Sequence, residues 1–572
     1  MIHIWKSLTR YERRLCILLL ISAVTNPFSA LATLIFHYTP EYHCNVTAQI
    51  NTVTSKHFQM FNRTYNSTEI TLLNEYLIPE ETDALGRSAL SHCHAYNRTK
   101  QQLVDFASYN TPGSFRSNVT AQNVKCSSTT FFFEKGVESA VREFDMVCDN
   151  AWKKPMALIS YMIGKFAGTY SSGWFSDKFG RRINFLVFTF VQTIAMIIMA
   201  FANSYNMYVA LFVVIGFSGV GNYGGAIVLG SETVKKEHRN FVCTFIAVGF
   251  SIGYMILPLI GYLCGNWRWF SLVSGLMGLI YIPYIWLIDE TPSWLTASGK
   301  AKQARKVLQK IANYNKQNDY VFDKNETDKT SKTKKISILN AWWLLIKTPK
   351  LLFRLMITCS VWFVCNMSYY AIAFDTNSLS GSRFLNCFYA GVVELAGYLI
   401  SYFTVEKGGR KYTVIGFMTI AGIATVASPF TRLWSNVATT LFTMCAKLSV
   451  AVGYHVVYLS TPEMFPTAIR HSSLATSSTF GRLGGVLAPV IIFTGKGGTN
   501  YPTYVASGAL TLIISALFIL TPDTHNRKLP ETVEEAVNMT LNLPCSVNDS
   551  ISDQELKELN ENSESKKLQA TI

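Results

Sequence analysis

Charged residues are scarce in this sequence. Asp, Glu, Lys and Arg together make up 15% of its 572 residues, whereas hydrophobic residues make up 49%. A soluble domain usually has about 25% charged residues and shorter apolar segments. The net charge of +15 is not a nucleic-acid signal, because most basic residues fall in loops that one consistent topology places on the same side of a membrane. The composition therefore excludes a soluble protein and predicts a membrane protein with no nucleic-acid partner.

Motifs of soluble enzymes and ATP-driven pumps are absent or misplaced. The sequence contains neither G-x-x-x-x-G-K-[ST] nor H-E-x-x-H. A G-x-G-x-x-G pattern at 219–224 and a G-x-S-x-G pattern at 249–253 lie inside apolar runs, without the preceding strand that a dinucleotide site or a nucleophile elbow requires. No cleavable signal peptide is evident, since the first apolar run is long and no small-residue cleavage site follows it. We therefore predict a protein that is not an enzyme, has no covalent cofactor and uses ion gradients for any transport.

Twelve apolar runs dominate the chain, and each is long enough to cross a bilayer as a helix of about 20 residues. The expected helices are 15–36, 154–174, 183–202, 207–229, 241–262 and 267–288 in the first half and 351–374, 384–404, 411–430, 438–459, 474–494 and 502–521 in the second. This pattern predicts an all-α membrane protein of two six-helix halves, with both termini on one side.

Polar segments divide these helices into regions. The expected regions are an N-terminus at 1–14, helix 1 at 15–36, a loop at 37–151, helices 2–6 within 152–288, a loop at 289–350, helices 7–12 within 351–524 and a tail at 525–572. The basic N-terminus and the lysine-rich loop at 289–350 belong in the cytoplasm by the positive-inside rule. A surface helix is expected at Lys300–Ala312, and the polar tail is expected to be largely disordered.

The long loop between helices 1 and 2 has the features of an extracellular domain. Five N-x-[ST] glycosylation sites cluster in it, at Asn45, Asn62, Asn66, Asn97 and Asn118. Four cysteines lie there as well, at Cys44, Cys93, Cys126 and Cys148. An even number of extracellular cysteines predicts two disulfides, and three connectivities remain open. We expect a large glycosylated, disulfide-bonded loop.

A polar signature recurs in both halves. Residues 173–182 spell G-x-x-x-D-x-x-G-R-R between two apolar runs, and residues 406–411 repeat the second part of it in degraded form. An E-x₆-R pair and an acidic residue followed by threonine also recur at nearly the same offset. The repeated residues are Asp177, Arg181 and Arg182 with Glu406 and Arg410, Glu232 and Arg239 with Glu463 and Arg470, and Glu290-Thr291 with Asp523-Thr524. Such repetition predicts a duplicated transporter.

Four ionisable residues lie near the middle of predicted spans, where a charge costs roughly 2.5–3.5 kcal/mol and usually marks a pathway. They are Lys165, Glu394, Lys447 and Arg482. The structural alternative for each is an ion pair between helices, for instance Glu394 with Lys447. Arg482 is the best candidate for a ligand contact, because a guanidinium can hold a carboxylate with two parallel hydrogen bonds.

Tyrosines on the same predicted helices suggest a partner for a positive charge. Tyr369, Tyr370 and Tyr458 could hold a quaternary ammonium by cation–π attraction. Together with a carboxylate at Arg482 they would make a zwitterion site, although apolar packing is the commoner role of any single tyrosine.

These motifs resemble those of the organic cation, anion and zwitterion transporters of the major facilitator superfamily. The resemblance covers nearly the whole chain and is strongest with the sodium-coupled carnitine branch. The stretches that carry it are Thr39-Pro40-Glu41 with Cys44, the sequence FDMVCD at 144–149, the signature at 173–182, NY at 222–223 leading into VLGSE at 228–232, ETPSWL at 290–295 and PEMFPT at 462–467 with Arg470. The resemblance implies a major facilitator fold and transport by alternating access.

The resemblance also implies roles for single residues. It relates Asn26, Asn222 and Tyr223 to sodium dependence and places Arg482, Lys447 and Tyr458 beside the substrate. It implies that the inner face is locked in one state by Asp177, Arg181, Glu232 and Arg239. Lys165 departs from the small or apolar residue usual in the family, and a second buried cation favours anions. The end of the chain, Ala570-Thr571-Ile572, lacks the hydroxyl residue of a PDZ-binding tail.

We therefore predict a multi-pass secondary transporter of the plasma membrane, with both termini in the cytoplasm. It is expected to move small organic cations or zwitterions, carnitine-like first, with Na⁺ as a coupling ion. An organic anion exchanger is the first alternative, supported by Lys165, Lys447 and Arg482. A transport-dead receptor or sensor on the same fold is the second, and the intact signature argues against it. A membrane-embedded enzyme fits least.

Overall fold

The computed structural model describes both halves of the chain and parts of the segments that connect them. The described residues are 2–40, 42–44, 78–82, 88–97, 122–126, 131–133, 138–316, 347–376, 379–431, 434–466, 469–493, 501–525, 530 and 532–539. Within these ranges the chain is mainly helical, as the sequence predicts.

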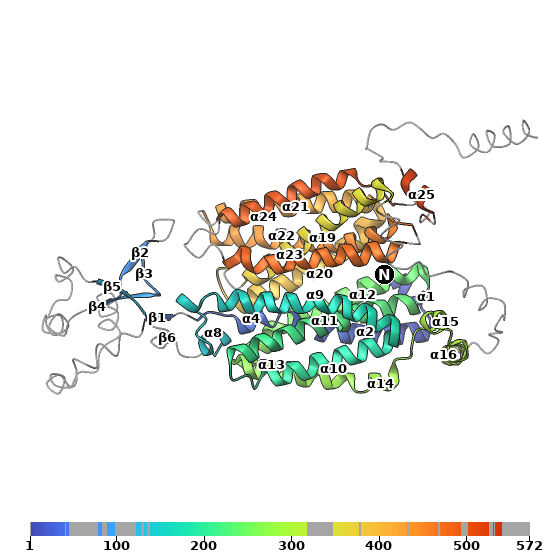
Figure 1. The fold of residues 1–572 in the computed structure, drawn as a ribbon, viewed down its shortest axis with the longest axis horizontal. Helices are drawn as coiled ribbons and strands as arrows, with labels where there is room; N and C mark the ends of the chain where they lie inside the picture. The colour runs from blue at the N-terminus through green and yellow to red at the C-terminus, as the bar shows by residue number, and fades with distance from the viewer. Residues whose placement is uncertain are drawn as a thin grey trace, which may run out of the picture.

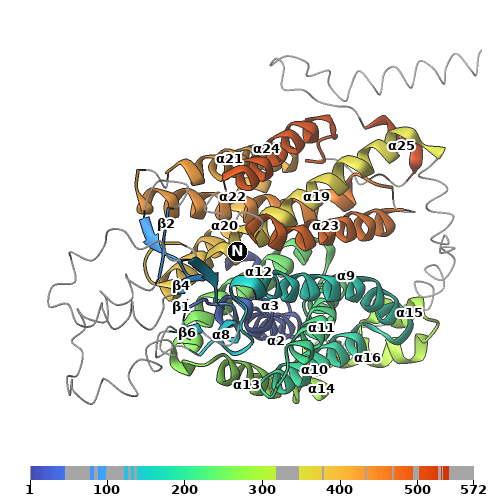
Figure 2. The same cartoon turned by 60° about the vertical axis from the view of Figure 1, so that its left-hand side comes forward.

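The long helices form two bundles that lie side by side. The first half contains α2 (Arg10–Thr25), α3 (Pro27–Ala30), α4 (Thr33–Phe36), α9 (Lys153–Phe179), α10 (Arg181–Met199), α11 (Tyr205–Thr233), α12 (Arg239–Cys264), α13 (Trp267–Met277) and α14 (Tyr284–Leu287). The second contains α19 (Pro349–Asp375), α20 (Arg383–Gly408), α21 (Arg410–Thr431), α22 (Asn436–Glu463), α23 (Arg470–Phe493) and α24 (Tyr501–Leu517). Figure 1 shows the first half in blue to green below the second half in yellow to red, and Figure 2 shows the same division from a turned view.

The two ends of the bundle differ. Short strands project from one end, which we call the strand end (Figure 1). The opposite end, which we call the terminal end, carries α1 (Ile2–Ser7) and α25 (Val533–Asn538), the helices nearest the two chain termini. It also carries α15 (Pro292–Ala297) and α16 (Ala301–Tyr314), which follow the first half. The surface helix expected at Lys300–Ala312 is confirmed as α16.

Helix 1 begins earlier than expected and is interrupted. Its N-terminus is fixed by a capping box, in which the Thr9 hydroxyl accepts the backbone N–H of Glu12 and the Glu12 carboxylate accepts that of Thr9. The helix therefore starts at Arg10 rather than near residue 15. Pro27 has no N–H to continue the ladder, so α2 ends at Thr25 and two short helices complete the span.

The helix α9 is the most polar member of the bundle. Among the described residues, eleven helical segments are long and apolar enough to span a membrane, and α9 is not one of them, although it has 27 residues. It nevertheless packs against α11 within its own half and against α23 of the other. At Gly168 an added Cβ would lie 2.2 Å from the carbonyl oxygen of Phe217, so α9 and α11 approach to backbone contact. The second predicted span is thus α9, and close packing against its neighbours compensates for its low hydropathy.

The two halves meet along two helix pairs. These pairs are α12 with α20 and α9 with α23. At the strand end the guanidinium of Arg383 also lies 3.6 Å from the ring centroid of Tyr38, which joins the second half to the end of helix 1. Any site between the halves is therefore bordered by α9, α12, α20 and α23.

Strands and disulfides organise the described part of the loop at the strand end. Three antiparallel ladders pair β1 (Tyr42–Cys44) with β6 (Phe131–Phe133), β2 (Glu80–Thr82) with β3 (Ser88–Leu90) and β4 (His94–Asn97) with β5 (Gln122–Lys125). Of the three open connectivities, the structure has Cys44–Cys126 and Cys93–Cys148. Asn97 ends β4, whereas Asn45, Asn62, Asn66 and Asn118 lie outside the described residues.

The described part of the tail contains one short helix. Thr532 and Glu535 form a second capping box that starts α25. Arg354 is buried near the start of α19 and donates to the backbone carbonyls of Ala536 and Met539. It thereby satisfies carbonyl groups at the C-terminal end of α25. Residues 540–572 lie outside the described part of the chain.

Candidate functional site

A charged cluster lies at the terminal end of the first half, where α9 turns into α10. The Nε atom of Arg181 is 3.1 Å from Oε1 of Glu232 on α11, and its Nη1 is 2.7 Å from Oδ1 of Asp177, one turn earlier. Thr291 donates its hydroxyl to Glu232 at 3.0 Å. The carboxylate of Glu290 accepts the backbone N–H of Arg181 at 2.8 Å and so caps the N-terminus of α10. The signature therefore ties α9, α10, α11 and α15 together.

The second half repeats this arrangement with the residues that the sequence offset predicts. Arg410 Nε lies 2.6 Å from Oε2 of Glu463, and Thr524 donates its hydroxyl to the same oxygen at 2.7 Å. Both halves thus place an arginine, a glutamate and a threonine in one cluster at the terminal end. Each of these ion pairs lies within one half, so each stabilises the end of its own bundle.

The remaining residues of the repeated motifs make other contacts. The E-x₆-R pairs do not form ion pairs, because both glutamates bind the arginines of the signature instead. Arg239 is exposed and has no ion pair with a described residue, and Arg470 donates to the backbone carbonyl of Pro530 at 3.1 Å. Arg182 donates its backbone N–H to the carboxylate that caps α10, and Glu406 is exposed.

Gly180 should be essential to the turn between α9 and α10. Its φ is +117°, and an added Cβ would lie 2.2 Å from the Oε2 atom of Glu290. We expect Gly180→Ala to destabilise the protein by about 1–3 kcal/mol, because the residue would be strained and would displace the capping carboxylate. Thermal unfolding in detergent measures this. Gly173→Ala is the matched control, since nothing lies within 4 Å of its Cβ position, and equal unfolding temperatures for both variants would contradict the prediction.

Two cations from different halves face each other midway along the bundle. Lys165 on α9 donates to the Tyr370 hydroxyl at 2.7 Å and lies 5.0 Å from the ring centroids of both Tyr370 and Tyr161. Arg482 on α23 donates to the Thr169 hydroxyl at 3.4 Å. The two cations are close enough to interact electrostatically, and both are half-buried although they lie between the halves. They therefore lie at the contact between α9 and α23, where the two halves meet.

The other two mid-span charges form a buried pair. Lys447 Nζ lies 3.7 Å from Oε2 of Glu394, and both side chains are almost completely inaccessible, at 1% and 0% exposure. The Glu394 carboxylate also accepts the hydroxyls of Tyr369 at 3.0 Å and Tyr398 at 3.1 Å, and Lys447 donates to Tyr254 at 2.8 Å. The structural alternative proposed for these two charges is thus what the structure shows. Their charges cancel within the second half.

Several tyrosines lie between this pair and Arg482. Tyr454 and Tyr458 lie one turn apart on α22 with ring centroids 5.7 Å apart, and Tyr454 stacks on Tyr369 at 6.2 Å. Tyr458 packs edge-on against Trp362 at 4.4 Å. Both tyrosines of α22 interact electrostatically with Arg482. The structure therefore brings the predicted substrate residues of α19, α22 and α23 together in one cluster.

Several residues of this site were not singled out from the sequence. Tyr161, Tyr254, Tyr398 and Tyr454 all contact the ionised groups. Three of them stand four residues from a predicted site residue, and this spacing puts two side chains on one helix face. Tyr254 has no such neighbour, so only the packing of α12 against α20 reveals it.

The residues expected to bear on sodium separate into two places. Asn222 donates to Gln192 at 2.7 Å and accepts from Ser22 at 3.3 Å, and Gln192 in turn donates to Ser29. Asn26 is buried nearby on helix 1, and its side-chain nitrogen has no hydrogen-bond partner among the described residues. Within this network lies a cavity of about 20 Å³, the space of one water molecule or bare cation.

Tyr223 lies outside this network, near the central tyrosines. Its ring lies 5.6 Å from that of Phe250 and interacts electrostatically with Tyr458 and Glu394. Consecutive residues of a helix point about 100° apart, so Tyr223 faces the central tyrosines whereas its neighbour faces the interior of the first half. The structure does not bring Tyr223 to the asparagines.

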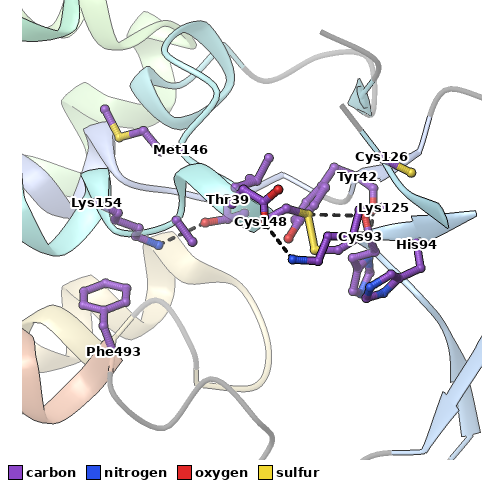
Figure 3. A pocket seen from close by; sticks show the side chains of 14 residues that line it. Thr39, Tyr42, Cys93, His94, Lys125, Cys126, Met146, Cys148, Lys154 and Phe493 are labelled. Atoms are coloured by element: carbon purple, nitrogen blue, oxygen red, sulfur yellow. Dashed lines mark hydrogen bonds and ion pairs between the residues drawn. A yellow bond between two sulfur atoms is a disulfide. The ribbon is translucent and has the colours of Figure 1, made fainter. Parts of the chain in front are cut away.

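A larger pocket lies at the strand end, between the disulfide-bonded loop and the bundle (Figure 3). It has a volume of about 520 Å³. Lys154 at the start of α9 donates to Thr39 at 3.0 Å and lies 5.3 Å from the ring centroid of Phe493 on α23. On the loop side Lys125 pairs with Asp149 at 3.4 Å. This pocket therefore opens where the two halves meet at the strand end.

The chain is similar in sequence to known membrane transporters. The family described as "Sugar (and other) transporter" matches residues 110–536. Mouse solute carrier family 22 member 21 is 26% identical and covers 92% of this chain and 90% of its own length. Human organic cation/carnitine transporter 2 is 25% identical, and the Drosophila melanogaster organic cation transporter protein is 27% identical, each covering 92% of both chains.

Solved structures agree on the fold. The proton:xylose symporter XylE bound to 6-bromo-6-deoxy-D-glucose superposes with a TM-score of 0.54 at 15% identity, covering 93% of this chain and 99% of that one. The inward-open xylose transporter XylE from E. coli gives 0.53 at 17% identity over 67% and 90%. At these identities the likeness shows the major facilitator fold and leaves the substrate open.

Proposed function

The chain belongs to the family of sugar and other transporters, and from this premise we propose that it carries small organic ions bearing a carboxylate by alternating access. The observation that supports the carboxylate is the pair of cations between the halves. Neither Lys165 nor Arg482 forms an ion pair with a carboxylate among the described residues, whereas Glu394 is already matched by Lys447. A substrate carboxylate would supply the missing negative charge and could accept two parallel hydrogen bonds from Arg482.

A carnitine-like zwitterion fits the tyrosines as well as the cations. With its carboxylate at Arg482, a quaternary ammonium could rest on the faces of Tyr370, Tyr454 or Tyr458, where cation–π attraction contributes about 1–2 kcal/mol. Several relatives are themselves named organic cation/carnitine transporters, which supports this choice. A simple cation without a carboxylate would instead meet two uncompensated positive charges.

An organic anion is the second candidate, and Lys165 is the observation that favours it. This lysine places a second positive charge beside Arg482, so a dicarboxylate could bind both. In that case the protein would work as an organic anion exchanger. A transport-dead receptor on the same fold would bind one of these ions without moving it.

The charge asymmetry supports an orientation in the plasma membrane. The terminal end carries the basic helix α16 and the arginines of both signatures, so we place it in the cytoplasm by the positive-inside rule. The disulfide-bonded strand end then faces the oxidising extracellular side. In this orientation both arginine–glutamate clusters stabilise the cytoplasmic ends of their own halves while the halves rock against each other.

Sodium coupling is proposed at the asparagine network of the first half. Asn222→Ala should weaken the sodium dependence of uptake by about tenfold or more, because it removes a side-chain oxygen beside the small cavity. The measurement is the sodium concentration for half-maximal uptake. Thr193→Val at the rim of the same cavity is the control for a merely steric change. An unaltered sodium response in Asn222→Ala would remove the network from ion binding.

The experiment that tests the function is uptake into cells that express the chain. Labelled carnitine, tetraethylammonium and a dicarboxylate are offered separately, with sodium present and with sodium replaced. Carnitine uptake supports the zwitterion site, and dicarboxylate uptake alone supports the anion exchanger. Uptake of tetraethylammonium alone would contradict the proposed carboxylate requirement, and binding without uptake of any compound would support the receptor.

A further inference from the structure

The pocket at the strand end has no part in the site between the halves. Three parts of the chain enclose it (Figure 3): the disulfide-bonded loop, the first half through Thr39 and Lys154, and the second half through Phe493. The ammonium of Lys154 lies 5.3 Å from the ring centroid of Phe493, so the two halves meet at one wall of the pocket. A molecule that fills the pocket would therefore touch all three parts at once.

A disulfide and a hydrogen bond fix the loop side of the pocket. The disulfide Cys93–Cys148 ties the start of β4 to the segment that leads into α9. The Nδ1 atom of His92 is 2.8 Å from the carbonyl oxygen of Tyr42, which joins this segment to β1. This wall is therefore in place before a ligand arrives, as is usual for small-molecule sites.

The size of the pocket fits a molecule larger than carnitine. Its volume of about 520 Å³ lies within the range of about 300–1,000 Å³ that is typical of sites for drug-sized ligands. Its apolar lining consists of Tyr42, Met146, Val147, Ala151 and Phe493. Binding of an apolar ring body here would be favourable, because it removes these side chains and the ligand from water.

The charged residues of the lining favour a negative ligand. They are two lysines, Lys125 and Lys154, against one aspartate, Asp149. Lys125 pairs with Asp149 at 3.4 Å, but both side chains are largely exposed, so solvent weakens this pair. Lys154 is half-buried and donates to the Thr39 hydroxyl at 3.0 Å. An anionic group beside this hydroxyl would attract the ammonium more strongly, because ionised acceptors make stronger hydrogen bonds.

We propose that this pocket binds amphipathic organic anions and that its occupation holds the strand end closed. Such a ligand has an apolar ring body with one sulfonate, sulfate or carboxylate, which lies at Lys154 while the body lies against Phe493 and the loop. Because the pocket is complete only where the halves meet, the ligand binds the closed strand end best and shifts the protein toward it. The binding does not depend on the proposed function, whereas the shift rests on the proposed alternating access.

The test measures binding of dansyl sulfonate, a fluorescent amphipathic anion, to the full chain in nanodiscs of zwitterionic lipid. Dansylamide has the same ring body without the charge and is the neutral comparison. Both are measured in the Arg482→Ala variant, which lacks one of the two cations between the halves. Dansyl sulfonate should bind saturably and at least about tenfold more tightly than dansylamide, because a hydrogen bond between charged groups contributes about that much. Absence of saturable binding overturns the proposal.

Variants at the start of α9 decide whether Lys154 holds the anion. Lys154→Gln keeps a donor for Thr39 but removes the charge, so it should weaken dansyl sulfonate at least about tenfold and change dansylamide less than about twofold. Lys153→Gln is the matched control, because Lys153 donates to the carbonyl of Phe144 at 3.3 Å and is not among the lining residues. An unaltered affinity in Lys154→Gln, or an equal loss for both compounds, contradicts the assignment.

A variant of the second half keeps the test decisive if Lys154→Gln does not fold. Phe493→Ala removes the ring that the second half contributes to the pocket. Both compounds should then bind more weakly, by about threefold or more, because each loses an aromatic contact. Unchanged binding of both compounds would mean that the second half takes no part in the site.

Spin labels measure the shift toward the closed state. They are attached at Asn203→Cys on the first half and Val437→Cys on the second, both exposed at the strand end, with the exposed Cys445 replaced by serine. Saturating dansyl sulfonate should increase the short-distance population, and Lys154→Gln should remove this response at the same concentration. A distribution that the ligand leaves unaltered overturns the proposed closure. Because neither measurement involves transport, failure of the uptake experiment and failure of these are distinguishable.

Discussion

Arg482→Ala is expected to abolish uptake of the proposed carboxylate-bearing substrate while leaving the protein at the cell surface. The guanidinium lies half-buried between the halves, where it interacts with Lys165, Tyr454 and Tyr458 but with no carboxylate among the described residues. Removing one partner of a buried, hydrogen-bonded charge pair costs about 2–5 kcal/mol of binding, or roughly 30- to 5,000-fold in affinity. The initial rate of uptake at several substrate concentrations measures this.

Two further variants separate the geometry of Arg482 from its charge. Arg482→Lys keeps the positive charge but loses the planar fork, so it should recover only a small part of the uptake. Arg305→Ala on the exposed face of α16 removes an arginine outside the site and should leave uptake unchanged. Full uptake in Arg482→Ala at normal surface expression would remove this residue from the site and with it the proposed carboxylate contact.

Breaking the buried pair of Glu394 and Lys447 should cause the largest loss of stability. Lys447→Met leaves the Glu394 carboxylate at 0% exposure without its cation, and such an uncompensated buried charge costs about 3–5 kcal/mol. The tyrosine hydroxyls that donate to Glu394 recover only part of this. The unfolding temperature in detergent should fall by several degrees or more, and less protein should reach the surface.

The double variant Glu394→Gln with Lys447→Met is the matched control. It removes both charges and keeps similar volumes, and replacing a buried ion pair by uncharged residues is often neutral for stability. Its unfolding temperature should therefore lie well above that of Lys447→Met alone. A double variant as unstable as the single one would mean that packing of the lysine, rather than charge balance, carries the effect.

Features that depend on a single helix could be predicted from the sequence. Long apolar runs have to become helices in a bilayer, so the spans and the two halves could be predicted directly. The pattern [ST]-x-x-E, here Thr9 and Glu12, marks the helix start at Arg10 only when it is recognised as a capping box. Mid-span charges need partners, which is why Glu394 and Lys447 could be paired from sequence alone.

Contacts that depend on how helices pack were not predictable. The repeated spacing marked Glu232 and Arg239 but could not say which arginine binds the glutamate, and in the structure Arg181, which follows the turn at Gly180, does so. The disulfide of Cys93 with Cys148 joins the start of β4 to a segment 55 residues later, which cysteine spacing does not encode.

The polarity of α9 has a consequence for how the protein is made. A segment that leaves the ribosome enters the membrane from the translocon according to its own hydrophobicity, and α9 carries Lys165 near its centre and falls below the other spans. Its insertion therefore depends on neighbours that emerge later, chiefly α10 and α11, which can shield its polar face. We therefore expect the insertion of α9 to be more sensitive to mutation than that of the other spans.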